Sequence, residues 1–318
     1  MVHAKLTVLG NINIDFVMET DRLPDPGENL VGKNLRFVPG GKAANQAVTA
    51  ARLGAQVTLI GRVGRDAFGP ALVDNFEREG INTDYIVRDE EAVTGAAFVA
   101  LMPSGENSIL TVLGANDRCD PEQVEAASPA IERADQLLVQ LAVPTETVDR
   151  AIQIAVDRGV PVQLDPTPIG RGLPKLWHRA YRVTPNESEA SAVSKITVSD
   201  VPSAVEACRK LRRRGVKVPV VKLGGTGCVV LDDQGPRLVE GYSVEVVDTT
   251  GAGDAFAAGL AVRSAEGAPI DCALAFANAC GALACTVVGA QPSLPRREAV
   301  EKFLKLQGGE EKASVIAL

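Results

Sequence analysis

Short segments with strand-like alternation of apolar and polar residues open the chain. An apolar strand is predicted at residues 6–9, directly before Gly10. Segments with the period of two that a half-buried strand requires follow at 12–18, 30–38, 94–101 and 108–113, with a turn expected at 103–105 between the last two. Two helices are predicted between these strands, at 43–53 and 70–79, because each apolar-periodic segment is followed by a glycine.

From about residue 120 onward, apolar segments alternate regularly with helical ones. The predicted strands are 136–141, 160–164, 182–183 and 218–222, the predicted helices are 145–157 and 201–214, and a hairpin covers 227–239. A strand at 244–247 is expected to lead into a glycine-rich turn and a long helix. This alternation is typical of a mostly parallel sheet with helices on both faces.

The early alternating strands do not fit such a sheet. We therefore predict one three-layer α/β/α domain over residues 1–318, with a small antiparallel β-lid formed by about 12–38 and 94–113. The tail at 308–318 is expected to fray.

Composition narrows the possible partners. Hydrophobic residues make up 46% of the 318 residues, which is enough for a substantial core, and the formal net charge is -7. An acidic chain has no general attraction for nucleic acid or an anionic membrane, so we expect neither. The stretch 272–290 has almost no charge and could span a bilayer by length. Its small residues and the central Asn278 favour a buried helix instead.

Cysteine and histidine usage limits the chemistry. The six cysteines form no C-x-x-C pair and the sequence shows no secretory leader, so we expect reduced, mostly buried thiols and a cytoplasmic protein. The chain contains only two histidines, His3 and His178. A histidine-ligated metal site or a histidine-based triad is therefore not expected.

The strongest chemical signal is Asp248-Thr249-Thr250-Gly251-Ala252-Gly253-Asp254, which precedes an apolar helical segment. A glycine turn at a helix N-terminus exposes backbone N–H groups at the positive end of the helix dipole, which makes an anion site. A carboxylate beside such a site suits a general base that takes a proton from a hydroxyl during phosphoryl transfer. The alternative is an ordinary N-terminal aspartate that stabilises the helix.

Two common phosphate-binding motifs are absent. Gly40-Gly41-Lys42 continues with Ala43 rather than Ser or Thr, so it is no Walker A motif. No G-x-G-x-x-G follows the first predicted strand, which disfavours a dinucleotide-dependent dehydrogenase.

The same segments carry a resemblance to a known family. The glycine-rich segment around Gly41 and the segment ending in Asp254 look like the two signatures of ribokinase-like (PfkB-type) carbohydrate kinases. Further matches cover nearly the whole chain, at 10–15, 24–28, 184–189 and 289–293.

The resemblance implies an ATP-dependent sugar kinase in which Asp254 is the base. It implies an anion hole formed by Gly251, Ala252 and Gly253, and sugar contacts from Asn13, Asp15, Gly41, Lys42 and Asn45. Because residues i and i+2 of a strand share a face, Asn13 and Asp15 point the same way. The alternatives are a polar strand face turned to water for this pair, a helix-surface position for Asn45 and a solvated Lys42.

The nucleotide and metal roles rest on the resemblance alone. It assigns Mg²⁺ contact through water and phosphates to Asn186 and Glu189, for which helix capping is the alternative. It assigns ATP binding to Lys222, Gly224, Thr226, Gly227 and Asn278, the last of which could instead be a buried, hydrogen-bonded amide. A K⁺ site, largely of backbone carbonyls, is implied at Asp248, Thr250, Ala284, Val287, Gly289 and Ser293.

Two positions depart from the pattern that the chain resembles. That pattern commonly has a glutamate in contact with the sugar where this chain has Ala142, and a lost charge-assisted hydrogen bond is worth roughly 1.5–3 kcal/mol. It usually has a glycine where this chain has Ala43. A pentose, ribose first, is the expected substrate. A nucleoside, fructose, a ketodeoxy sugar acid or deoxyribose is the alternative, and a non-catalytic sugar- or nucleotide-binding regulator is the alternative of another class. The resemblance also implies a homodimer through the lid.

Overall fold

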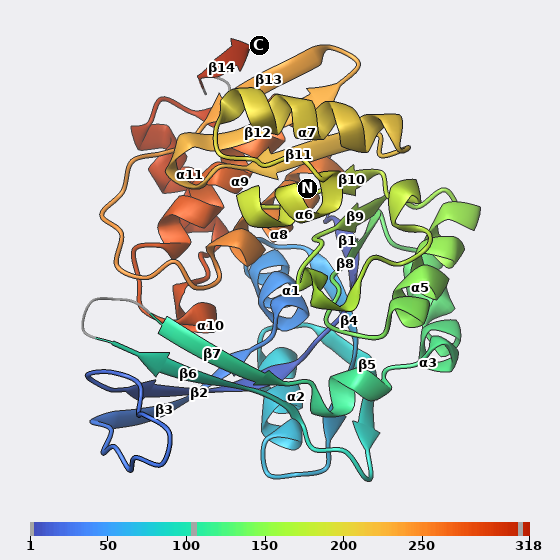
Figure 1. Cartoon of the computed structure of the whole chain (residues 1–318). Helices are drawn as coiled ribbons and strands as arrows, with labels where there is room; N and C mark the ends of the chain where they lie inside the picture. Colours follow the sequence, from blue (N-terminus) through green and yellow to red (C-terminus); the bar gives the residue numbers. More distant parts are fainter. Residues whose placement is uncertain (1–2, 103–106, 311–313) are drawn as a thin grey trace.

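The structure is a computed structural model that describes residues 3–102, 107–310 and 314–318. It consists of a body, in which helices cover both faces of a large sheet, and a separate small sheet at one end of the body (Figure 1). The turn predicted at 103–105 lies outside the described residues.

The large sheet holds ten strands within the described ranges. Their bounds are β1 Lys5–Leu9, β4 Gln56–Gly64, β5 Asn82–Asp89, β8 Gln136–Val139, β9 Val162–Leu164, β10 Arg182–Val183, β11 Val218–Lys222, β12 Gly227–Asp232, β13 Gly235–Glu240 and β14 Val315–Ala317. Their spatial order is β14-β13-β12-β11-β10-β9-β8-β1-β4-β5. The neighbours from β5 to β11 are parallel, whereas β11 to β14 pair antiparallel. The carboxyl ends of the parallel strands therefore meet along one edge, where ligands bind in open α/β sheets.

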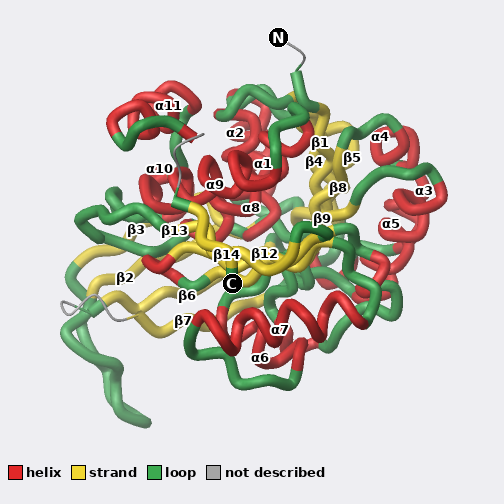
Figure 2. The backbone as a smooth tube through the Cα atoms, turned by 90° about the horizontal axis from the view of Figure 1, so that it is seen from above, coloured by secondary structure: helices red, strands yellow, loops and turns green. Residues whose placement is uncertain are grey.

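Two layers of helices bury the faces of this sheet, as Figure 2 shows from above. One layer contains α1 Lys42–Arg52, α2 Gly69–Arg78, α8 Ala252–Ala265, α9 Ile270–Ala284 and α11 Arg297–Leu306. The other contains α3 Pro121–Ala126, α4 Ser128–Glu132, α5 Thr145–Asp157, α6 Glu187–Ser194 and α7 Val201–Arg213. Shorter helical turns are α10 Ala290–Ser293 and the 3₁₀ segments Gly114–Arg118, Ile169–Arg171, Trp177–Arg179 and Gly224–Thr226. The predicted three-layer fold is confirmed.

The small sheet, hereafter the lid, has four strands in the order β3-β2-β6-β7. They are β2 Asn13–Glu19, β3 Asn34–Gly40, β6 Gly95–Leu101 and β7 Asn107–Val112. A separate small sheet was expected, and it is present. Its two outer pairs are antiparallel, but β2 and β6 run parallel in the middle, because both enter the lid from neighbouring parts of the large sheet.

The two faces of the lid differ in chemistry. Asn13 and Asp15 lie on one face of β2, and Phe16 lies on the other, where it stacks on Phe98 with ring centroids 4.8 Å apart. Phe68, just before α2, packs edge-on against Phe16 at 5.4 Å and links the lid to the body. The face that carries Phe16 is hereafter the apolar lid face. The opposite face carries Asn13 and Asp15 at its start and Val17 and Val99 further along.

Two expectations about the end of the chain are wrong. Residues 244–247 form no strand, and Val246 and Val247 are exposed. The backbone N–H of Val247 donates instead to Cys285 O, just after α9, at 2.8 Å. The tail does not fray throughout, since Val315–Ala317 forms β14 and pairs with β13.

The low-charge stretch forms the buried helix α9, which ends at Ala284. Throughout the described part of the chain, none of the helices combines the length and hydrophobicity that crossing a bilayer requires.

Candidate active site

Asp254 lies in the first turn of α8, at the carboxyl edge of the sheet. Gly251 caps this helix with φ of 82°, a backbone conformation that strains other residues. The Asp254 side chain is buried, and its Oδ2 accepts a hydrogen bond of 2.9 Å from Asn45 Nδ2. Gln46 Nε2 approaches Oδ1 at 3.4 Å. Helix α1 therefore supplies both donors that hold the carboxylate.

Burial sets the proton affinity of Asp254. It raises the pKa of this carboxyl group, Lys42 counteracts the rise, and the nearby Asp165 adds to it. A carboxylate with a raised pKa is a stronger proton acceptor than an exposed aspartate, which suits a general base. Next to it, Gly253 leaves the helix N-terminus open: a Cβ atom there would lie 3.5 Å from Lys222 Nζ.

Asp165 is a site residue that the sequence interpretation missed. It follows β9, and its Oδ1 accepts a hydrogen bond of 3.0 Å from Lys222 Nζ at the end of β11. Gln46 Nε2 also approaches Asp165 Oδ2 at 3.3 Å. An aspartate directly after a buried parallel strand was the available signal, because such strand ends converge at the ligand edge.

Three of the predicted sugar-binding residues, Asp15, Lys42 and Asn45, lie near Asp254. Asp15 lies beneath β3, where a Cβ atom on Gly40 would overlap its carboxylate, and burial together with Asp254 raises the pKa of Asp15 to about 7. Two buried acceptors here, Asp15 Oδ1 and Asn45 Oδ1, have no hydrogen-bond partner. Buried polar atoms are nearly always paired, so these two oxygens are suited to ligand hydroxyl groups.

Gly41 and Lys42 start α1 at the same place. Gly41 has φ of 93°, and a Cβ atom there would lie 2.6 Å from Asn11 O. Burial alone would lower the pKa of Lys42, but the carboxylates of Asp254, Asp165 and Glu189 raise it overall. Lys42 is therefore a half-buried cation next to several carboxylates.

Asn186 and Glu189 form a reciprocal capping box at the start of α6. Asn186 N donates to Glu189 Oε2 and Glu189 N donates to Asn186 Oδ1, each at 2.9 Å. Helix capping was the alternative role considered for these two residues. Glu189 nevertheless lies close to the site, because burial and then the nearby Asp165 raise its pKa. Their Mg²⁺ role stays a prediction.

The predicted nucleotide residues follow β11. Lys222 ends that strand, Gly224 and Thr226 bound the 3₁₀ turn, and Gly227 begins β12. Asn278 lies on α9, where its Nδ2 donates to Val239 O and to Glu240 O at 3.1 and 3.0 Å. Its amide hydrogens therefore bind the end of β13, as the buried-amide alternative requires, and its adenine contact stays a prediction.

Four of the six residues assigned to a cation site are linked by hydrogen bonds. Asp248 Oδ1 accepts from Thr250 N at 2.9 Å, Asp248 Oδ2 accepts from Gly289 N at 2.8 Å, and Ser293 Oγ reaches Thr250 O at 3.5 Å. These contacts keep the pKa of Asp248 low although burial opposes this. Ala284 ends α9, and Val287 lies in the exposed connection to Gly289.

The site combines an open helix N-terminus, a buried carboxylate and unpaired oxygen atoms that can accept hydrogen bonds from hydroxyl groups. This combination defines a site for phosphoryl transfer to an alcohol. Comparison with known proteins agrees with this class. The pfkB family carbohydrate kinase profile matches residues 3–297, and the chain belongs to that family. This confirms the resemblance found in the motifs.

Individual relatives agree. The chain is 39% identical to the ribokinase of Bacillus subtilis over 300 residues, which covers 94% of this chain and 99% of that protein. It is 38% identical to the ribokinase of Haemophilus influenzae, with 94% and 98% covered. A solved structure of Arabidopsis thaliana ribokinase with ribose and ATP superposes with a TM-score of 0.90 at 33% identity, covering 96% of this chain and 99% of that one.

We predict that Asp254→Asn lowers kcat by about 10²–10⁴-fold, because the amide cannot accept the proton of the attacking hydroxyl. ATP affinity, measured by titration, should change little. The wild-type rate should fall on acidification with an apparent pKa above the usual aspartate range. The reason is that Asp254, with its raised pKa, takes up a proton at a higher pH than an ordinary aspartate.

The matched control is Asp271→Asn, which removes a carboxylate that pairs with Arg237 on another part of the fold. A kcat for Asp254→Asn within about tenfold of wild type in single-turnover assays would contradict the base role.

Proposed function

We propose that the chain transfers the γ-phosphoryl group of ATP to the primary hydroxyl of ribose, giving ribose 5-phosphate. The observation that supports this best is the pair of unpartnered buried acceptors, Asp15 Oδ1 and Asn45 Oδ1, beside the buried carboxylate of Asp254. Buried acceptors need O–H or N–H donors, and adjacent hydroxyl groups of a sugar provide them. The ribokinase relatives support ribose among the sugars.

The roles of the residues follow from their placement. Asp254 takes the proton of the hydroxyl as the phosphoryl group arrives, and the turn Gly251-Ala252-Gly253 at the start of α8 forms the anion hole for its oxygens. The N–H groups of Gly251 and Gly253 are the donors, since Ala252 N donates to Thr249 O at 3.2 Å. Lys222 lies beside this anion site. Bound Mg²⁺ supplies charge neutralisation on the phosphates. Asn186 and Glu189 would hold it through water, and their position at the carboxyl edge fits that role.

The substrate is tested by two linked measurements. ATP consumption is compared for ribose, deoxyribose, fructose, a ketodeoxy sugar acid and a nucleoside. Ribose should give the highest kcat/KM. Another compound with kcat/KM more than about a hundredfold above that of ribose would overturn the assignment, since a site built for a given hydroxyl discriminates strongly.

Ala142 provides the second measurement. It is buried just beyond β8, near Gln140, whose Nε2 donates to Gln46 Oε1 at 2.6 Å. If ribose is the substrate, Ala142→Glu should lower its KM by about tenfold, the value of one charge-assisted hydrogen bond. If the pocket is fitted to another sugar, the new carboxylate is buried without a partner and activity falls. The Ala142→Glu substitution therefore improves the enzyme in the first case and impairs it in the second.

We propose further that K⁺ binds beside the anion site. The links among Asp248, Thr250, Gly289 and Ser293 support this, because they fix the loop whose carbonyl oxygens would hold the ion. Replacing Na⁺ or a bulky organic cation by K⁺ at constant ionic strength should raise kcat. Asp248→Asn should abolish that response. An equal rate in all cations would contradict the proposal and leave the kinase assignment intact.

We also propose that body and lid act as one catalytic unit over residues 1–318, and that two copies pair through the apolar lid face in the cytoplasm. Phe37, Phe98 and Leu110 share this face, and the Leu110 side chain is 76% exposed. The buried thiols of Cys119, Cys208, Cys228 and Cys280 are consistent with a reducing compartment. An apolar patch rimmed by polar residues marks an interaction site.

Sedimentation tests the pairing. Wild type should sediment as a dimer and Leu110→Arg as a monomer, because the arginine would be buried without a partner at the interface. The control Leu306→Arg places the same charge at an exposed leucine at the end of α11 and should stay dimeric. A monomeric wild type, or a dimeric Leu110→Arg, would refute the lid interface.

A further inference from the structure

Asn116 is a fully buried side chain to which no role was assigned from sequence. It lies in the 3₁₀ turn Gly114–Arg118. Its Oδ1 accepts from Ile12 N at 2.8 Å, and its Nδ2 donates to Ile12 O at 3.1 Å and to Asn13 Oδ1 at 2.9 Å. All three bonds reach the start of lid strand β2, where the chain passes from the body into the lid.

The orientation of the Asn116 amide follows from its backbone partners. A backbone N–H can only donate and a backbone carbonyl can only accept, so Ile12 fixes which end of Asn116 carries oxygen. The second hydrogen on Asn116 Nδ2 then requires an acceptor, which is Asn13 Oδ1. The Asn13 amide is thereby fixed as well, with its oxygen used and its two N–H hydrogens remaining for a ligand.

The surroundings allow no other arrangement at this point. Gly95 lies opposite Asn13 in the β2–β6 pairing, and a Cβ atom at Gly95 would overlap Asn116 Nδ2 and lie 2.5 Å from Asn13 Oδ1. Glycine is therefore required for the two amides to meet. Alternative rotamers of either asparagine would leave a buried polar group unpaired.

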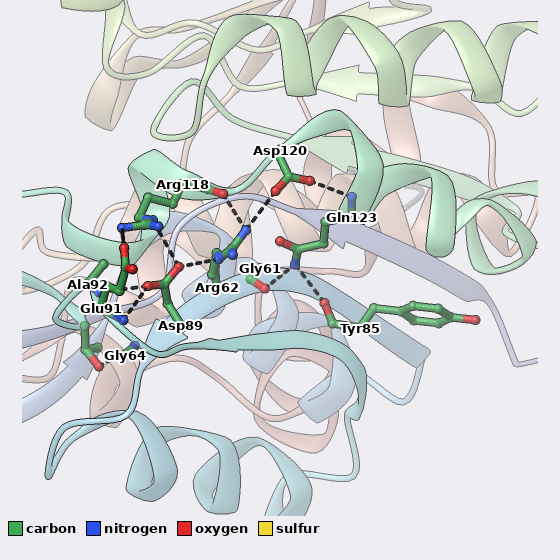
Figure 3. A network of polar contacts seen from close by, with 11 residues as sticks. Gly61, Arg62, Gly64, Tyr85, Asp89, Glu91, Ala92, Arg118, Asp120 and Gln123 are labelled. Atoms are coloured by element: carbon green, nitrogen blue, oxygen red, sulfur yellow. Dashed lines mark hydrogen bonds and ion pairs between the residues drawn. The ribbon is translucent and has the colours of Figure 1, made fainter.

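A polar network fixes the turn itself (Figure 3). Arg62 on β4 donates to the carbonyl oxygen of Arg118, the last residue of the turn. Arg62 also pairs with the buried Asp89 at 2.8 Å, and Arg118 pairs with the same carboxylate at 3.2 Å. At the other end of the turn, Ala115 N donates to Val93 O at 2.7 Å. The position of Asn116 is thus set by the body.

The side-chain amide of Asn45 is also fixed, but in the orientation opposite to that of Asn13. Its Nδ2 donates to the carboxylate of Asp254, which can only accept when ionised, so its unpaired Oδ1 faces the ligand as an acceptor. Asp15 likewise offers an acceptor. The site therefore presents one fixed donor, Asn13, and one fixed acceptor, Asn45, beside the unpaired carboxyl oxygen of Asp15.

We propose that Asn116 is a positioning residue for sugar recognition: by occupying Asn13 Oδ1 it makes Asn13 a hydrogen-bond donor to a sugar oxygen. This inference rests on the proposed sugar kinase function. It assigns a specific pattern to the substrate, an oxygen that accepts at Asn13 and hydroxyl groups that donate at Asp15 and Asn45. A sugar without an oxygen at the first place leaves the Asn13 N–H groups unpaired.

The test is Asn116→Leu, which keeps the approximate volume and removes the amide. The KM and the calorimetric Kd for ribose should rise by about tenfold or more, the value of one lost hydrogen bond to a fixed partner. The kcat at saturating ribose should stay within about threefold and ATP affinity should not change, since Asp254 and the anion site are untouched.

Gln123→Met is the matched control. Gln123 is also buried, and its Nε2 donates to Gly61 O and Tyr85 O in the same network without contacting a sugar residue (Figure 3). The Gln123→Met variant should have a lower melting temperature than wild type, as Asn116→Leu should, but its KM for ribose should be unchanged. An equal rise in ribose KM in both variants would reduce Asn116 to a structural role and overturn the proposal.

Asn116→Asp provides a second variant of unchanged shape. Its ionised form can still accept from Ile12 N but cannot donate to Asn13, whereas its protonated form can. The ratio of its ribose KM to that of wild type should therefore fall as the pH is lowered. If the ribose KM values of Asn116→Asp and wild type agree within about twofold at every pH, the proposal is refuted. The proposed function is tested separately from the role of Asn116: if it is wrong, the wild-type enzyme fails to phosphorylate ribose.

Discussion

A buried carboxylate is the constraint on which this structure depends. Asp254 lies in the first turn of α8, and an unpaired charge there would be costly. Asn45 and Gln46 offset that cost by donating from α1, which requires the two helices to pack closely. The packing brings the glycine-rich turn of α8 against the start of α1. The contacts that satisfy the charge therefore also bring together the residues proposed as base, anion site and sugar contacts.

The parallel sheet explains why the other charges gather at this edge. Asp165 and Lys222 end or follow strands separated in space only by β10, and they pair at 3.0 Å although 57 positions separate them in sequence. With Lys42 and Glu189 they form a cluster in which each cation lowers the cost of its acidic neighbours. Lys222 is thus already held in place by a carboxylate before any ligand binds.

The lid combines two tasks because strand side chains alternate. On β2, Asn13 and Asp15 lie on the face proposed to bind the sugar, while Phe16 belongs to the opposite apolar face. Asn116 and the network behind it connect Asn13 to the body.

The sequence by itself determined the local features. Periodicity predicted α5 at 145–157 as observed, and the period of two placed Asn13 and Asp15 on one face. The glycine-rich signature identified Asp254 at a helix start, because capping and glycine conformations are encoded within a few residues. Family motifs indicated the fold and the phosphoryl-transfer chemistry. What the sequence could not determine depends on partners distant along the chain. The apolar segment 244–247 has strand-like composition, yet it forms no strand, and Val247 N donates to Cys285 O beyond α9. The parallel pairing of β2 with β6, the ion pair of Asp165 with Lys222 and the hold of Asn116 on Asn13 each join segments far apart in sequence. A hydrogen bond or ion pair of this kind has no periodic signal, since its geometry exists only after the sheet has brought its two ends together.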